Sequence, residues 1–232
     1  MTEAPTSGSD DVTPSTALVA RVLTEAMTSG SGLLAAALGG MVLGALSLLL
    51  NGVLPGGSSR LVNSGAVWVV GAFVAGAVLR DGGWRTWLAG TAVLVGAVAG
   101  YYGSLVVFEH RTMSPGVLTG PAQWALVGLA AGPLFATAGA WWRDPRRARR
   151  VVALCLLGGV FVAEGAYLLA SHRPPAEALL VSAAGVLVPL ALGRGARDRL
   201  FGVMGLLPAA VAGFGGYLVL DAVMDVAFTR AG

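Results

Sequence analysis

An ionisable side chain inside an apolar stretch is the residue of this sequence best placed to do chemistry. Glu164 lies within the apolar run from Val151 to Ala170. At roughly 1.5 Å of rise per helical residue, it would lie about 20 Å beyond Val151 and in the outer half of a bilayer. A charge there costs several kcal/mol unless it is neutralised, paired or hydrated. Glu164 is therefore either a protonatable or cation-binding group or a carboxyl that fixes helix packing through a hydrogen bond to Tyr101, Tyr102 or Tyr217.

A second group of carboxylates lies near the end of the chain. Asp221 and Asp225 are four residues apart, so they share one face of a helix. They could form an acidic funnel that attracts cations towards Glu164, or they could be solvated last turns that emerge from the lipid. The candidate ligand- or ion-binding residues are Glu164, Asp221, Asp225, Tyr101, Tyr167 and Trp68.

Enzymatic and metal-binding signatures are missing from the sequence. It contains no His-Glu-x-x-His, no Gly-x-Ser-x-Gly and no Walker loop. Its two histidines, His110 and His172, do not have the spacing of metal ligands, and zinc needs three or four converging groups. We therefore expect no metal and no cofactor, and an intramembrane enzyme is the least favoured class.

The composition indicates which elements position these residues. Hydrophobic residues make up 56% of the 232 positions and charged residues 12%, against roughly 25% charged in a soluble domain. This predicts an all-α, polytopic transmembrane helical bundle of about seven spans, each near the roughly 20 residues that cross a bilayer. The sixth span is short and contains Pro189, so it could be tilted, kinked or re-entrant. The predicted spans are Leu33–Leu54, Leu61–Leu79, Trp87–Val107, Gln123–Trp142, Val151–Ala170, Leu179–Leu192 and Leu200–Phe228.

Arginine sets the predicted orientation, because loops rich in Arg stay on the cytoplasmic side. Eleven of the 15 basic residues, all of them arginine, fall in the tail and loops that a cytoplasmic N-terminus would place inside. They gather in loops instead of forming a basic face, so nucleic-acid binding is not expected. We expect a multi-pass plasma membrane protein with residues 1–31 as a disordered cytoplasmic tail and residues 32–232 as the transmembrane domain. Within the tail, residues 17–27 have the spacing of an interfacial helix.

Small residues and a faint repeat characterise the predicted spans. Glycine and alanine fill them, which favours a tight bundle because small residues let helix backbones approach closely. After the first span, three hairpins end in similar segments at 100–105, 164–169 and 215–220. The pattern predicts one span followed by three tandem helical hairpins, although chance similarity between Gly/Ala-rich helices explains it about as well.

Four segments carry a resemblance to a known family. They are the runs at 61–68, 72–76 and 100–102, and a longer one from Ala131 to Arg143. Together they resemble an uncharacterised family of multi-pass membrane proteins common in actinobacteria. The resemblance implies one integral membrane domain and no assigned activity. More loosely, the chain is similar in size and character to the substrate-binding subunits of energy-coupling-factor transporters, which usually have six spans.

Two functional hypotheses remain open. The first is a membrane protein that binds or transports a small solute or cation, either as a transporter or as a transporter subunit. The second is a structural or regulatory subunit that binds another membrane protein through its Gly/Ala faces and Arg loops. A Glu164→Gln variant distinguishes them, because loss of ligand binding supports the first and loss of assembly or stability alone supports the second.

Overall fold

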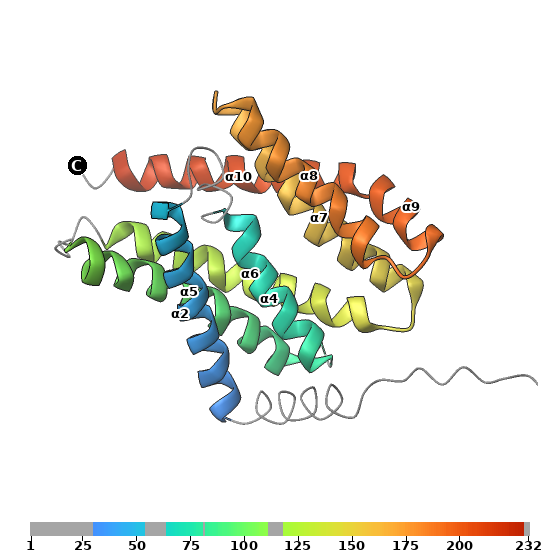
Figure 1. Ribbon diagram of the computed structural model, residues 1–232, viewed down its shortest axis with the longest axis horizontal. Coiled ribbons are helices and arrows are strands. Elements are labelled where there is room, and N and C mark those ends of the chain that lie inside the picture. Colours follow the sequence, from blue (N-terminus) through green and yellow to red (C-terminus); the bar gives the residue numbers. More distant parts are fainter. Residues whose placement is uncertain (1–29, 54–63, 81, 111–117, 230–232) are drawn as a thin grey trace, which may run out of the picture.

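Helices are the regular elements of the described residues, which in the computed structural model are 30–53, 64–80, 82–110 and 118–229 (Figure 1). The side chains at 30, 31 and 224–229 are outside the description, as are the expected N-terminal tail and interfacial helix. The all-α prediction is confirmed. The helices are α2 (Gly30–Val53), α4 (Gly65–Leu79), α5 (Trp84–Glu109), α6 (Thr119–Arg143), α7 (Arg147–Ala170), α8 (Pro175–Leu192), α9 (Ala196–Met204) and α10 (Leu206–Thr229).

Six of these helices are long and apolar enough to cross a membrane: α2, α5, α6, α7, α8 and α10. Their outward faces carry large apolar side chains that a soluble protein would bury. Val53 is 79% exposed, Leu126 65% and Leu207 72%. Such a surface is stable only against hydrocarbon, so the chain is a multi-pass membrane protein.

Two predicted spans differ from the observed helices. Residues Leu61–Leu79 were expected to span the bilayer, but the helix there, α4, has 15 residues, about 22 Å against a hydrocarbon core of about 30 Å. It begins at Gly65 because Ser64 caps it. The predicted span Leu200–Phe228 is divided at Gly205 into the short α9 and the long α10.

The short sixth span is longer than expected. It forms α8, an 18-residue helix that satisfies the length and composition of a membrane crossing despite Pro189. Pro189 lies in the last turn, and its own carbonyl accepts a hydrogen bond from the Gly193 N–H. A proline this close to the end removes little of the helical ladder.

Helices α2 and α5 pack backbone to backbone. Gly40 and Gly44 on α2 face the main chain of α5, and Gly96 and Gly100 on α5 face the main chain of α2. Both pairs have the Gly-x-x-x-Gly spacing that permits close helix crossing in lipid. Gly40 meets Val93 and Ala97, and Gly44, one turn later, meets Ala97 and Tyr101. Residue numbers therefore increase in the same direction along both helices, so α2 and α5 run parallel and begin at the same end of the bundle.

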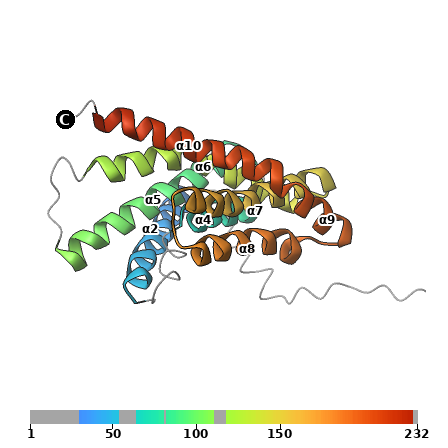
Figure 2. The same cartoon turned by 90° about the horizontal axis from the view of Figure 1, so that it is seen from above.

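Helix α7 is the centre of the C-terminal half. Figure 2 shows it between α8 on one side and α10 on the other, and it packs extensively on both. The first two predicted hairpins, α4 with α5 and α6 with α7, are packed pairs. Within the described residues, α8 and α10 are not extensively packed against each other, so the third expected hairpin is separated by α7.

Candidate functional site

Glu164 lies on α7, with 9% of the residue exposed, and points to the beginning of α4. Its Oε2 accepts three hydrogen bonds. The Ser64 hydroxyl and the Ala66 backbone N–H each donate at 2.8 Å, and the Tyr217 hydroxyl of α10 donates at 3.0 Å. One carboxylate oxygen therefore joins three helices, and no described residue donates to the other oxygen, Oε1.

The position of this carboxylate follows from the chemistry of a helix N-terminus. The first N–H groups of α4 have no partner within the helix, and they carry the positive end of its dipole. Ser64 satisfies one, because its side-chain oxygen accepts from the Val67 N–H at 3.4 Å. Glu164 satisfies a second, from a residue about 100 positions away. The two acceptors stabilise a helix end that lies inside the bundle.

A small aromatic pocket borders this helix end. It has a volume of about 130 Å³ and is lined by Gly65, Trp68, Tyr101, Tyr102 and Trp124. The rings of Trp68 and Tyr101 lie 5.7 Å apart, and those of Tyr101 and Tyr102 lie 5.4 Å apart edge to face. The Trp68 indole N–H donates to Ser47 of α2 at 3.2 Å, which fixes the ring.

Gly65 separates the pocket from the carboxylate. A Cβ atom at this position would lie 3.9 Å from Glu164 Oε2, 3.6 Å from the Tyr217 hydroxyl and 4.0 Å from the Trp124 ring. The absence of a side chain at Gly65 therefore leaves the aromatic rings and the carboxylate as neighbours.

Of the two carboxylates predicted on α10, Asp221 is connected to this site. The Tyr167 hydroxyl donates to its two oxygens at 3.0 and 2.9 Å, and the Tyr167 ring stacks on Tyr217 at 5.0 Å. Asp221 itself is exposed. A chain of contacts thus leads from the surface at Asp221 through Tyr167 and Tyr217 to Glu164. The Asp225 side chain lies outside the described residues.

A wider apolar groove also reaches Gly65 and Trp124. It has a volume of about 620 Å³ and is lined mainly by residues of α6 and α10, with a few from α4 and α7. Trp124, Phe135 and Tyr217 supply its aromatic surface, and nearly all other lining residues are aliphatic. The groove is therefore suited to an acyl chain or another helix.

Among the described residues, no three His, Cys, Asp or Glu side chains are grouped to hold a metal ion. Glu164 is accompanied by hydroxyl and N–H donors, which suit a carboxylate and not a metal.

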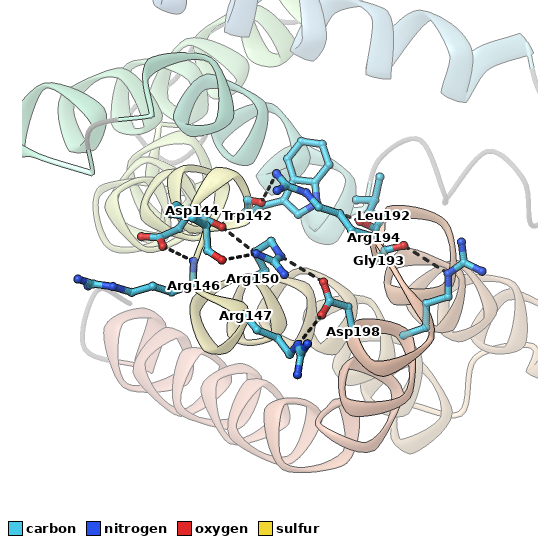
Figure 3. A network of polar contacts seen from close by, with 11 residues as sticks. Trp142, Asp144, Arg146, Arg147, Arg150, Leu192, Gly193, Arg194 and Asp198 are labelled. Atoms are coloured by element: carbon cyan, nitrogen blue, oxygen red, sulfur yellow. Dashed lines mark hydrogen bonds and ion pairs between the residues drawn. The ribbon is translucent and has the colours of Figure 1, made fainter. Parts of the chain in front are cut away.

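Arginines define the opposite end of the bundle, where the turns after α4, α6 and α8 gather (Figure 1). Asp198 at the start of α9 is 4% exposed and pairs with Arg150 at 3.1 Å and Arg147 at 3.4 Å (Figure 3). Arg150 also donates to the backbone carbonyls of Asp144 and Pro145 at 3.2 and 2.7 Å. This network fixes the turn between α6 and α7 against α9.

Asp144 in that turn is held as a carboxylate. The backbone N–H of Arg146 donates to it at 2.7 Å, and the Arg149 guanidinium pairs with it at 2.7 Å. These two interactions lower the pKa of Asp144 below its ordinary value, the backbone hydrogen bond contributing most.

The structure thus brings five of the six predicted candidates, Glu164 included, into two adjoining groups. Trp68 and Tyr101 line the pocket, and Tyr167 and Asp221 continue the chain of contacts from Glu164. Sequence reasoning left Ser64, Gly65, Tyr102, Trp124 and Tyr217 out of the candidate set. Ser64 before an apolar run has the signature of an N-cap and could have been included on that ground.

Comparison with known proteins identifies one match. Residues 24–223 match the model of a family of unknown function, DUF6518, and so the match covers the described membrane helices up to Val223 of α10. No curated protein and no solved structure matches the chain.

Proposed function

We propose that this protein binds a small cationic solute within the membrane, as a transporter or a transporter subunit. The chain belongs to DUF6518, a family of unknown function. The observation that carries the proposal is the pairing of an aromatic pocket with the Glu164 carboxylate across Gly65.

The chemistry of the pocket suits a cation. Aromatic faces attract cations by about 0.5–2 kcal/mol each, most strongly when water is excluded. Trp68, Tyr101, Tyr102 and Trp124 supply such rings, and Glu164 supplies the opposite charge. The volume of about 130 Å³ compares with ~30 Å³ for each molecule of liquid water, so the expected ligand is small.

The location of the site supports transport over soluble-ligand sensing. In transporters whose helices terminate inside the bilayer, helix N-termini point at anionic groups and helix C-termini at coupling cations. Helix α4 has this character, because it is too short to cross and its N-terminus meets Glu164. Similarity in size to the substrate-binding subunits of energy-coupling-factor transporters favours a subunit as one form of this function.

Binding of tetramethylammonium tests the proposal. The purified protein in a maltoside detergent, which has no ammonium group, is titrated while tryptophan fluorescence is recorded. We expect a saturable change from Trp68 and Trp124, with methylammonium and Na⁺ as smaller probes. In the Glu164→Gln variant, which keeps a hydrogen-bond acceptor, we expect the apparent affinity to fall at least about tenfold, equivalent to ~1.4 kcal/mol.

Two further variants sharpen this test. Gly65→Ala adds a methyl at ordinary contact distance from its neighbours, so it should fold normally and bind more weakly. Glu109→Gln removes a charge from the exposed end of α5 and should bind as the unmodified protein does. The absence of saturation with all three probes, or equal affinity in Glu164→Gln, would refute the proposal.

A second candidate function is that of a subunit that binds another membrane protein. In the membrane-spanning part of α10, 11% of residues are buried within the chain, and Gly215 and Gly216 have open space beside them. Small residues on an exposed face permit docking of a partner helix. Native mass spectrometry of the protein extracted from its own membranes separates the two functions: a stoichiometric protein partner favours the second, and a small retained mass favours the first.

A further inference from the structure

A polar pocket lies at the arginine end, away from the aromatic site. It has a volume of about 350 Å³, within the ~300–1,000 Å³ range of ligand sites. It is formed where α4 and α6 end and α7 begins. The side chains that define its character are those of Arg80, Arg143, Arg149, Trp141 and Asp144.

Among the described residues, the charges that line this pocket are unbalanced. Three of these residues are arginines and one is a carboxylate, Asp144, which already pairs with Arg149. None of the described residues forms an ion pair with Arg80 or Arg143. The Arg143 guanidinium is instead repelled by the positive charges of Arg80 and Arg194. A bound anion would relieve this repulsion.

Two of the three arginines are also held in place before any ligand binds. Arg143 lies over the Trp142 ring at 5.0 Å, and Arg149 lies over Trp141 at 5.8 Å. Arg150 fixes the turn below them through its bonds to the backbone carbonyls of Asp144 and Pro145 (Figure 3). Pre-ordered side chains lose less conformational entropy on binding, which favours affinity.

We propose that this pocket binds a phosphate group through Arg80 and Arg143, with Arg149 as a third positive charge. Guanidinium groups match phosphate oxygens in geometry and can bind them in pairs of parallel hydrogen bonds. The pocket lies at helix ends beside tryptophans, the level of lipid headgroups. The phosphate is thus that of an anionic phospholipid or of a soluble phosphate compound, and the chemistry of recognition is the same.

The experiment measures both sources. Protein in nanodiscs that contain phosphatidylcholine and phosphatidylglycerol is released for native mass spectrometry, and the retained lipids are counted. In parallel, inorganic phosphate is titrated against thermal unfolding of the protein in detergent. Selective retention of phosphatidylglycerol identifies a lipid site, whereas stabilisation by phosphate without retained lipid identifies a soluble ligand. Both outcomes support a phosphate site.

Variants of single arginines make the result specific. Arg80→Gln and Arg143→Gln should each reduce retention or phosphate affinity about fivefold, the effect of about one basic side chain near an anionic headgroup. Arg146→Gln is the matched control, since Arg146 lies in the same turn and is exposed but does not line the pocket. Its binding should be unchanged. Equal losses in all three variants would show only general charge attraction, and no binding in either arm would also overturn the proposal.

Discussion

Glu164 caps a helix to which it does not belong. It accepts from the Ala66 N–H in the first turn of α4, and it holds the hydroxyls of Ser64 and Tyr217 on the same oxygen. In the proposed function such a carboxylate would have both a structural and a chemical role, because the bonds that fix α4 also hold it beside the aromatic pocket. Substitutions at its partners therefore test structure separately from binding.

Ser64→Ala removes an N-cap acceptor and a donor to Glu164 in one step. We expect the free energy of unfolding to fall by about 1–2 kcal/mol, since loss of an N-cap alone costs about 1 kcal/mol. Unfolding in mixed detergent, followed by circular dichroism, measures this change. Ser104→Ala, at a buried serine inside α5, is the control, and equal stability in both variants would contradict the capping role.

Asp198→Asn tests the arginine network at the other end. The carboxylate is 4% exposed, and its partner Arg150 has a side chain that is 13% exposed. Removing one partner leaves a largely buried charge uncompensated, so we expect a loss of about 2–3 kcal/mol. Thermal unfolding compared with the exposed Asp221→Asn variant measures the difference, and a stability loss no larger than that of the control would refute this interpretation.

At the residue level, the apolar run around Glu164 predicts a carboxyl at membrane depth, and Tyr217 is one of three tyrosines predicted as its hydrogen-bond partner. The bond to Tyr217 is present at 3.0 Å. Ser64 and Ala66 were not anticipated as partners, because they are about 100 positions away and composition carries no information on which helix ends meet. The burial of Asp198 and its pairing with Arg150 could not be predicted for the same reason.

Among the helices, apolar runs predicted the membrane crossings well but not their interruptions. The run that begins at Leu200 contains no charge that would mark the break at Gly205. The break is consistent with Pro208 in the first turn of α10, which has no N–H to continue the α9 ladder. Glycine at 205 has a packing reason, since a side chain there would overlap the Cys155 sulfur. Helix α4 was expected to begin earlier because Leu61 and Val62 are as apolar as the helix itself.

The crossing of α2 and α5 gives a direct test of close packing. A methyl group at Gly40 would overlap the Val93 carbonyl oxygen, whereas a methyl group at Gly39 would lie more than 4 Å from the described atoms of neighbouring helices. Gly40→Ala should therefore lower the unfolding temperature of the protein by several degrees. Gly39→Ala should leave it unchanged or raise it slightly, because alanine is the better helix former. Similar unfolding temperatures for the two variants would mean that the backbones are not in contact.

For the whole molecule, most of the described arginines lie at one end, with Arg173 in the turn between α7 and α8 as the exception, and α2 begins at the arginine-rich end because it is parallel to α5. Both observations agree with the expected cytoplasmic N-terminus. The rule that predicts it concerns insertion into the membrane and not folding, so orientation stays a prediction.

Cysteine labelling tests the orientation. In a Cys155→Ser background, a cysteine replaces Ser171 between α7 and α8 or Arg146 at the arginine end. We expect an impermeant maleimide to label the first in intact cells and the second only after permeabilisation. The reverse pattern would place the arginine end outside the cell.

Helix α4 begins at the Glu164 carboxylate and ends at Arg80, so it joins the two candidate sites over about 22 Å. A helix of this length moves as a rod. If a ligand at one end shifts α4, thermodynamic linkage requires that it alter affinity at the other end, and by the same factor in both directions. A cation and a phosphate, bound at opposite ends of α4, would then each report the presence of the other.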